Sequence, residues 1–287
     1  MVAIVSALGG CAPGGQPQVD VEIHHLHGLA FSSDGHQLIV PAHHGILIYA
    51  DGRWQAPELP THDYMGYAPV DDGFYSSGHP DPSSDFVNPL GLVRSRDAGR
   101  SLTQLGFEGE SDFHVMGVGY RSHAVYVWNP APNSRLDVGM FYTLDDGSTW
   151  QQSGLDGLTA EPIQIAVHPV EPNVVALAAE EGLFFSRDHG DSFERLVDGP
   201  ATAATFSPDG SRLLFGYDRL YAYDLAGQEA QALPTPALSA ATPIMYIAVN
   251  PVQPDQIAIG TVGRDIYVSD DGGNSWKQIA REGRGES

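Results

Sequence analysis

Short apolar runs separated by turn residues recur along the whole chain. Ile163–Val167 and Val174–Ala178 flank a turn that contains Pro and Asn, and Ile244–Val249 precedes the alternating run Gln256–Gly260. Runs of this length, rich in Val and Ile, favour strands over helices. The sequence also holds 33 glycines and 21 prolines, about a fifth of its 287 residues. The pattern therefore predicts an all-β protein built from many short strands and tight turns.

A repeated motif accompanies these strands. Four segments share the pattern Ser/Thr-x-Asp-x-Gly-x-Ser/Thr followed by Leu, Trp or Phe: Ser95–Leu102, Thr143–Trp150, Ser186–Phe193 and Ser269–Trp276. Two looser units, Phe31–Gly35 and Phe206–Gly210, stand before the first motif and in the long gap before the last. Four strands in about 44 residues are typical of a propeller blade. We expect a six-bladed β-propeller with four-stranded antiparallel blades, covering residues 24–59, 60–108, 109–156, 160–198, 200–236 and 241–282.

The four motifs resemble the Asp-box (BNR) repeats of sialidase-like propellers, a family whose bacterial lipoprotein members are often labelled glycosyl hydrolases. In such a turn the aspartate accepts backbone N–H groups, and the glycine adopts a conformation that other residues avoid. We therefore expect structural roles for the four aspartates of the boxes, which are Asp97, Asp145, Asp188 and Asp271.

The charge balance excludes some classes of partner. Lys and Arg number 14 against 36 Asp and Glu, which gives a formal net charge of −22. Binding to nucleic acid and to anionic lipid surfaces relies on clustered Lys and Arg. We expect neither kind of partner for the folded part of the chain.

The N-terminal segment has a different character. Residues 1–10 are small and apolar, and Leu8, Gly9 and Gly10 precede the only cysteine, Cys11. This arrangement resembles a bacterial lipobox, in which the cysteine is lipidated. The resemblance implies a signal and tether over residues 1–18 and a single propeller over 19–287. It also implies an extracytoplasmic lipoprotein, periplasmic or on the cell surface, whose membrane contact is the lipid anchor alone.

The histidines point to a candidate site. Alignment of the first strands of blades one to three places His27, Met65 and Met116 in one column, with His25, Asp63 and His114 two residues earlier. Side chains two residues apart share one face of a strand, and the first strand of a blade lines the central channel. The loops between second and third strands open on the same mouth and carry further histidines. The expected metal ligands are His25, His27, His43, His44, Asp63, Met65, His79, His114 and Met116.

This ligand set favours a transition metal. Thioethers select Cu(I), and imidazole suits copper, zinc, nickel and iron. We expect copper ahead of zinc, with sequestration or delivery in the cell envelope as the leading function. The histidines also predict weaker binding below about pH 6, where imidazoles become protonated.

Two other functions stay open at this stage. The first, which the family resemblance implies, is glycoside hydrolysis by a carboxylate pair, with Asp63, Glu110 and Asp112 as candidates. The arginines and the Arg-Ile-Pro sequence of a sialidase site do not carry over, because the first inner strand reads His24-His25-Leu26-His27-Gly28. The second is a scaffold without chemistry, like the propeller-type assembly factors of photosynthetic membranes, with an envelope protein or a glycan as its partner.

Overall fold

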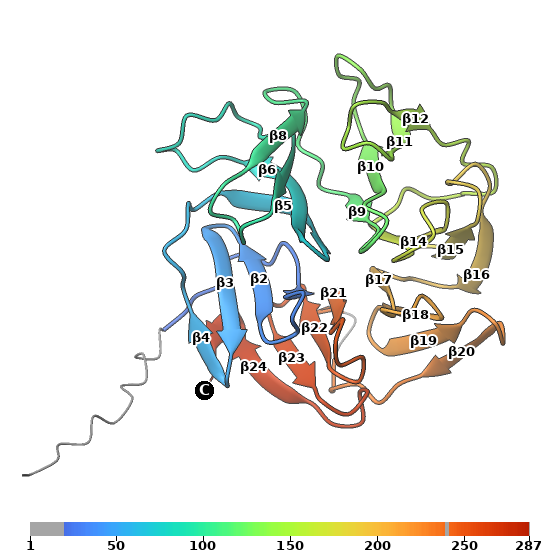
Figure 1. Ribbon diagram of the computed structural model, residues 1–287. Coiled ribbons are helices and arrows are strands. Elements are labelled where there is room, and N and C mark those ends of the chain that lie inside the picture. Colours follow the sequence, from blue (N-terminus) through green and yellow to red (C-terminus); the bar gives the residue numbers. More distant parts are fainter. Residues whose placement is uncertain (1–19, 239–240, 287) are drawn as a thin grey trace, which may run out of the picture.

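The computed structural model describes residues 20–238 and 241–286. Within these ranges every regular element is a strand, and six antiparallel sheets surround a central axis (Figure 1). The predicted six-bladed all-β propeller is confirmed. In the part of the chain that is described, no helix has the length and apolar character to span a membrane. Cys11 and the predicted anchor lie outside the described residues.

The strands occupy four positions from the channel to the rim. The innermost strands are β1 (Ala30–Phe31), β5 (Asp63–Val70), β9 (Met116–Val118), β13 (Gln164–Val167), β17 (Ala203–Phe206) and β21 (Ile244–Val249). The second strands are β2 (Leu38–Ala42), β6 (Gly73–His79), β10 (Val125–Asn129), β14 (Val175–Ala179), β18 (Arg212–Gly216) and β22 (Ile257–Thr261). The third strands are β3 (Gly45–Ala50), β7 (Leu92–Ser95), β11 (Gly139–Thr143), β15 (Gly182–Ser186), β19 (Leu220–Asp224) and β23 (Ile266–Ser269). The outer strands are β4 (Arg53–Gln55), β8 (Thr103–Gly106), β12 (Gln151–Gln152), β16 (Glu194–Asp198), β20 (Glu229–Ala232) and β24 (Lys277–Arg281), and β25 (Arg284–Gly285) follows β24.

Packing between neighbouring blades explains why the middle strands are apolar throughout. Every residue of β14 and β15 is buried, because both faces of the blade lie against other blades. Apolar clusters therefore combine residues of adjacent blades, as Ala176 of blade four and Phe215 of blade five do. Continuous apolar runs are expected for strands that are covered on both faces.

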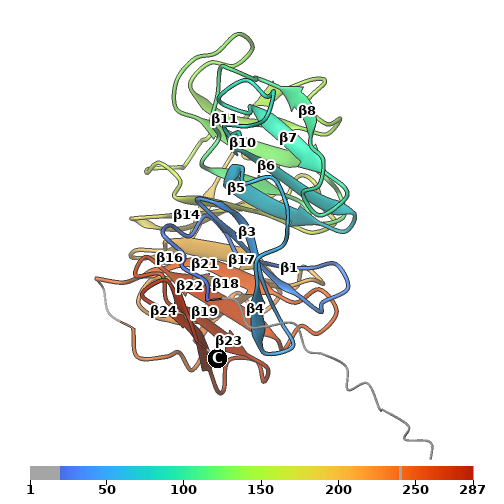
Figure 2. The same ribbon diagram turned by 90° about the vertical axis from the view of Figure 1, so that its left-hand side faces the viewer.

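The two ends of the chain close the ring. Glu22 pairs with Arg284 of β25, and the backbone N–H of Ile23 donates to the carbonyl of Gly283 at 2.6 Å. The Trp54 indole of β4 donates to the carbonyl of Ile279 in β24 at 2.8 Å. The blue strands of blade one accordingly lie beside the red strands of blade six in both ribbon views (Figures 1 and 2). Residues 22 and 23 thus extend blade six at its outer edge.

The inner strand of blade one is shorter than its predicted range. Leu26 forms only an isolated bridge to Ala42, and β1 begins at Ala30. Pro41 lies opposite the gap, where its carbonyl accepts the N–H of His27 at 3.0 Å. Proline has no N–H to donate in return, so the ladder is interrupted there.

The four box aspartates lie in the turns between third and fourth strands. In each turn one carboxylate oxygen accepts the backbone N–H of the residue four positions later at 2.8–3.0 Å. The other oxygen accepts the hydroxyl of that residue at 2.6–2.7 Å. The box glycines have φ between 80° and 90°, a region that favours glycine. These contacts explain why the motif recurs with fixed spacing.

Candidate functional site

Three segments bring histidines to one mouth of the channel. His25 and His27 precede β1, and His43 and His44 form the turn between β2 and β3. Asp63 is the first residue of β5 and pairs with His79, the last residue of β6. These positions lie at the same end of blades one and two, where a two-residue turn joins β2 to β3 and the longer segment 80–91 joins β6 to β7.

Three of the imidazoles form a compact group, which we call the mouth cluster: His25, His27 and His43. One nitrogen from each lies within 4.8 Å of the others, an arrangement that could hold a metal ion. Asp63 lies beside the cluster, with Oδ2 at 2.7 Å from Nδ1 of His43 and Oδ1 at 3.3 Å from Nε2 of His27. The Asp63 side chain is only 9% exposed.

His27 and the neighbouring Asp63 each have a buried polar atom that forms no hydrogen bond. Nε2 of His27 and Oδ1 of Asp63 are both buried, and neither has a hydrogen-bond partner. A buried polar atom without a partner costs about 1–3 kcal/mol. A cation close to both atoms would remove this cost, because nitrogen and carboxylate lone pairs are both metal ligands.

Burial keeps the His27 imidazole in the form that binds metals. Loss of hydration lowers the pKa of His27, and the nearby carboxylate of Asp63 opposes that shift without reversing it. The histidines of the mouth cluster and His114 lower the pKa further when they are charged. Neutral imidazole has the lone pair that a metal requires.

A second histidine–carboxylate group lies at the start of blade three, and we call it the Asp112 group. Oδ2 of Asp112 is 2.6 Å from Nε2 of His114 and 3.2 Å from Nε2 of His79. Nδ1 of His79 is 2.7 Å from Oδ1 of Asn88. The hydrogen bond with Asp112 raises the pKa of His114. The sequence had suggested Asp112 only as a glycosidase carboxylate, although its place two residues before His114 is a signal for shared chemistry.

The other expected ligands lie around these two groups. The ring centroid of His44 is 4.8 Å from that of His43 and 5.6 Å from that of His24. Met116 is buried in a cluster with Phe113, whereas Met65 is partly exposed within β5. The ligand atoms grouped at the mouth are therefore imidazole nitrogens with a carboxylate beside them.

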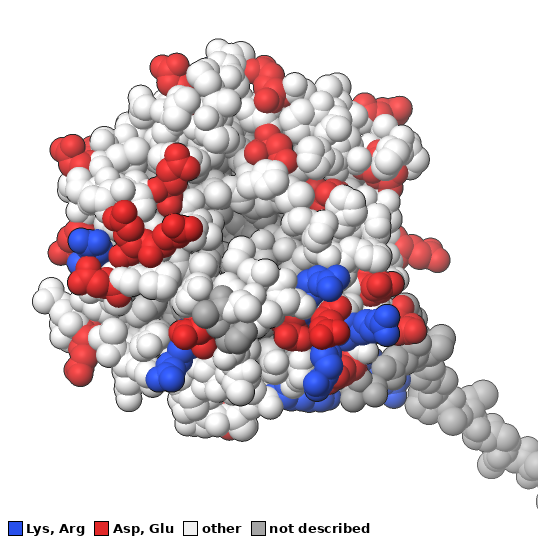
Figure 3. All heavy atoms as spheres, turned by 180° about the vertical axis from the view of Figure 1, so that it is seen from behind, with Lys and Arg blue, Asp and Glu red and all other residues white. Residues whose placement is uncertain are grey.

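Part of the predicted column lines a common cavity of the channel. His27 and Met116 border a space of about 80 Å³, which is also lined by His114, Gln164 and Met245. Seen from behind, the surface of the ring is hollowed at its centre, with acidic side chains around the hollow (Figure 3).

The proposed glycosidase carboxylates do not form a free pair. The exposed Glu110 accepts the N–H of Ser134 at 2.7 Å, and this bond lowers its pKa. A general acid of a glycosidase needs a raised pKa instead. Asp63 and Asp112 are both engaged with imidazoles.

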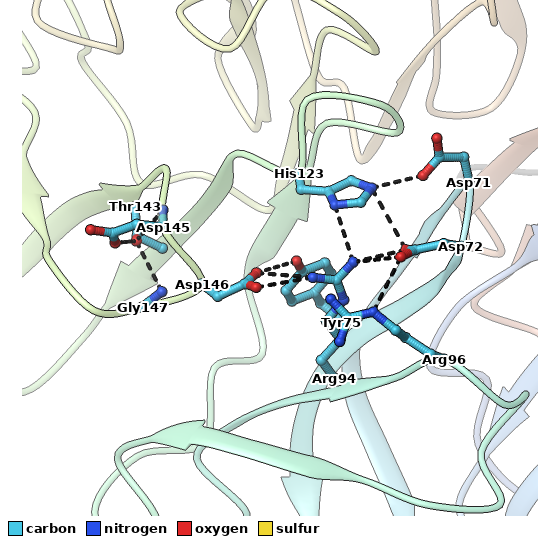
Figure 4. A network of polar contacts seen from close by, with 10 residues as sticks. All are labelled: Asp71, Asp72, Tyr75, Arg94, Arg96, His123, Thr143, Asp145, Asp146 and Gly147. Atoms are coloured by element: carbon cyan, nitrogen blue, oxygen red, sulfur yellow. Dashed lines mark hydrogen bonds and ion pairs between the residues drawn. The ribbon is translucent and has the colours of Figure 1, made fainter.

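The opposite ends of the same strands carry a network that the sequence analysis missed (Figure 4). The Arg94 guanidinium of β7 is 4% exposed and donates to both oxygens of Asp72 at 2.8–2.9 Å and to both of Asp146 at 3.0–3.2 Å. The Tyr75 hydroxyl donates to Asp146, and the Arg94 carbon Cζ lies 4.7 Å above the Tyr75 ring. We call this set, with His123 and Asp71, the Arg94 network. It joins blades two and three.

The Arg94 network contains a group of similar size to the mouth cluster. Asp71, Asp72 and His123 each offer a ligand atom within 4.8 Å of the others. Nδ1 of His123 lies 3.1 Å from Nη2 of Arg94, and Nε2 lies 2.7 Å from a carboxylate oxygen of Asp71. A guanidinium only donates, so Nδ1 is the acceptor and Nε2 carries the proton. Both nitrogens are satisfied, and the guanidinium already neutralises Asp72, so the geometry fits a metal ion poorly.

Similarity to known proteins is confined to the fold. No protein-family model matches the sequence, and no match is found among curated proteins. Among solved structures, a GH74 enzyme of Niastella koreensis matches with a TM-score of 0.61 and 15% identity over 90% of this chain. The GH74 xyloglucanase of Xanthomonas campestris matches with a TM-score of 0.55 and 17% identity over 91%. This chain spans 46% of each of these two enzymes, about half their length.

Two structures of YCF48 are matched over most of their length. A structure of YCF48 bound to D1 peptide has a TM-score of 0.51 and 15% identity, and the match covers 93% of this chain and 85% of YCF48. YCF48 from Cyanidioschyzon merolae gives a TM-score of 0.51 and 14% identity. The comparisons show that this β-propeller is similar in fold to both groups.

Proposed function

We propose that this propeller binds a divalent transition metal ion at the mouth cluster, with Asp63 as a further ligand. The observation that carries the proposal is the convergence of three imidazole nitrogens within 4.8 Å beside a buried carboxylate. The unpartnered His27 and Asp63 atoms support it, because both would gain a ligand that they lack. Side chains from two blades contribute, so the folded ring positions the ligands before metal arrives.

Copper is the metal we favour, ahead of zinc. Affinity of a nitrogen and oxygen site rises along the first-row divalent ions to copper and falls again at zinc. The mouth cluster supplies imidazole and carboxylate, so we place Cu(II) there. Met65 and Met116 stay proposed ligands for Cu(I) deeper in the channel, where soft thioethers would be preferred.

The lipobox-like sequence around Cys11 supports a proposal for the cellular role of this site. We propose an extracytoplasmic protein, anchored through Cys11, that sequesters or delivers copper in the cell envelope. An exposed cluster suits exchange with a partner, since His25 and His43 are both exposed.

A role as an assembly module is a second candidate. It is favoured by the match that covers most of YCF48, a protein that one structure shows bound to D1 peptide. For this chain the partner would be an envelope protein. Binding of metal and binding of a protein at the mouth are compatible.

Metal retention after equilibrium dialysis tests the metal site. The full chain, with Cys11→Ser in every sample to remove the thiol, is loaded with Cu(II) or Zn(II) and dialysed against a weak chelator. We expect His27→Ala/His43→Ala to lose the ion of the mouth cluster and therefore to retain one ion per chain fewer than the parent. The matched control is His36→Ala, an exposed histidine in the turn between β1 and β2. Equal retention in both variants would overturn the proposal.

A further inference from the structure

We propose that the mouth holds a second metal position, formed by Asp112, His79 and His114, so that the channel entrance binds a pair of metal ions. This inference rests on the proposed function of the mouth cluster and extends it to a neighbouring ligand set. Its three residues come from blades two and three, whereas the mouth cluster belongs to blade one.

The Asp112 carboxylate repeats the arrangement of Asp63. In both cases Oδ2 contacts an imidazole nitrogen, at 2.6 Å for Asp112 with His114 and at 2.7 Å for Asp63 with His43. In both cases Oδ1 is buried without any hydrogen-bond partner. Buried carboxylate oxygens are normally paired. Two such atoms at the entrance to one channel indicate that each carboxylate lacks a ligand.

The contacts of His79 point in the same direction. Nδ1 faces Oδ1 of Asn88 at 2.7 Å, while Nε2 faces Oδ2 of Asp112 at 3.2 Å. A neutral imidazole has one N–H, so it can donate to one of these oxygens only. A metal ion bound by Nε2 and Asp112 satisfies the other nitrogen, while the bond to Asn88 holds the ring in orientation. Such a bond on the second nitrogen is the usual support of a metal-bound histidine.

The two positions are close enough to share the entrance. His27 and His114 border the same cavity of about 80 Å³ in the channel. His27 belongs to the mouth cluster and His114 to the Asp112 group, so each set contributes one imidazole to the lining of this space. A pair of ions held there would suit a ligand that bridges them, such as a small oxyanion or a carboxylate.

Metal stoichiometry distinguishes this inference from the proposed function. The full chain with Cys11→Ser is titrated with Zn(II) and separately with Cu(II), and bound metal is measured after removal of loosely held ions. We expect two ions per chain in the parent. We expect one in His79→Ala/His114→Ala and one in His25→Ala/His43→Ala. His43, His79 and His114 are 44–61% exposed and His25 is also exposed, so these changes leave the core intact.

Other stoichiometries would overturn the second metal position, alone or together with the mouth cluster. One ion in the parent, retained in His79→Ala/His114→Ala and lost in His25→Ala/His43→Ala, overturns the second position and leaves the mouth cluster standing. No bound ion in the parent overturns both. For Cu(II), we expect the electron paramagnetic resonance spectrum of the parent to be broadened by coupling between two ions, and each variant to show the spectrum of an isolated ion. An isolated-ion spectrum in a parent that carries two ions also contradicts a paired site.

Discussion

The two ends of β5 carry histidine–carboxylate groups that look alike by distance but differ in what neutralises the carboxylates. At the mouth, Asp63 meets imidazoles, and its Oδ1 has no hydrogen-bond partner. At the other end, Asp72 meets the guanidinium of Arg94 through both of its oxygens. A permanent cation thus occupies one end, and the other end offers room for a cation that comes from solution.

The difference shows that proximity of ligands alone does not define a metal site. Both groups bring three possible ligand atoms within 4.8 Å. In the Arg94 network each ring nitrogen of His123 already has a partner, and metal binding would break those bonds. In the mouth cluster metal binding would supply missing partners. A structural network and a binding site are therefore distinguished by whether their possible ligand atoms already have hydrogen-bond partners, and not by which residues they contain.

The largest expected effect comes from removing the guanidinium of Arg94. Arg94→Met removes the charge-assisted hydrogen bonds to Asp72 and Asp146, which are 45% and 42% exposed, and we expect the free energy of unfolding to fall by about 3 kcal/mol. Urea denaturation measures the loss. Arg96→Met is the matched control, because Arg96 is 57% exposed and also contacts Asp72, and surface pairs contribute about 0–1 kcal/mol. A variant at position 94 as stable as this control would contradict a stabilising role for the network.

The second prediction concerns the metal ion that binds to the mouth cluster from solution. A ligand at a hundredfold excess over its dissociation constant stabilises the folded state by about 2.7 kcal/mol. We expect Cu(II) to raise the melting temperature of the parent, to raise that of His123→Gln equally, and to raise that of His27→Ala/His43→Ala by less. A thermal melt with and without metal measures the shift. Equal shifts in all three proteins would mean that the metal binds elsewhere.

The third prediction isolates one contact of the Arg94 network. Tyr75→Phe removes the hydroxyl that donates to Asp146 and keeps the ring beneath Arg94. We expect a loss of about 1 kcal/mol in the free energy of unfolding, with metal retention unchanged. Denaturation and dialysis of the same sample measure both quantities. Loss of metal in this variant would show that the two ends of the strands are coupled.

The smallest effect is a dependence on pH. Burial would raise the pKa of Asp72, but hydrogen bonds from Arg94 and Arg96 outweigh it and lower that pKa below its ordinary value of 3.8. A lowered pKa means that the contribution to stability is full above pH 3.8 and is lost as the pH falls through the lower folded value. We expect stability to fall more steeply below pH 4 in the parent than in Arg94→Met. Parallel profiles from pH 5 to pH 2 would contradict this account.

The fold could be predicted from the sequence because its determinants are local. Each Asp-box places its aspartate, glycine and hydroxyl residues within eight positions, so the turn can be predicted from one short segment of sequence. The sequence also predicted that the blade-one histidines converge, although His25 and His27 lie before β1 rather than within an inner strand. The start of β1 was missed because one residue, Pro41, interrupts a ladder that the apolar pattern alone would continue.

The chemistry that depends on distant residues was less predictable. Arg94 lies in an ordinary apolar strand, and its partners Asp72 and Asp146 are 22 and 52 positions away. No local motif connects them, so only the stacking of blades two and three reveals the network. The link between His79 and Asp112 likewise depends on the way two blades meet.

The most direct test of the central claim observes the histidine side chains themselves. Nuclear magnetic resonance spectra of the imidazole nitrogens, recorded while Zn(II) is added to the full chain with Cys11→Ser, report on each assigned ring. We predict that His25, His27 and His43 shift together at low metal concentration, while His123 keeps its spectrum. Simultaneous shifts of His123, or unchanged spectra at the mouth, would contradict the assignment of the mouth as the metal site.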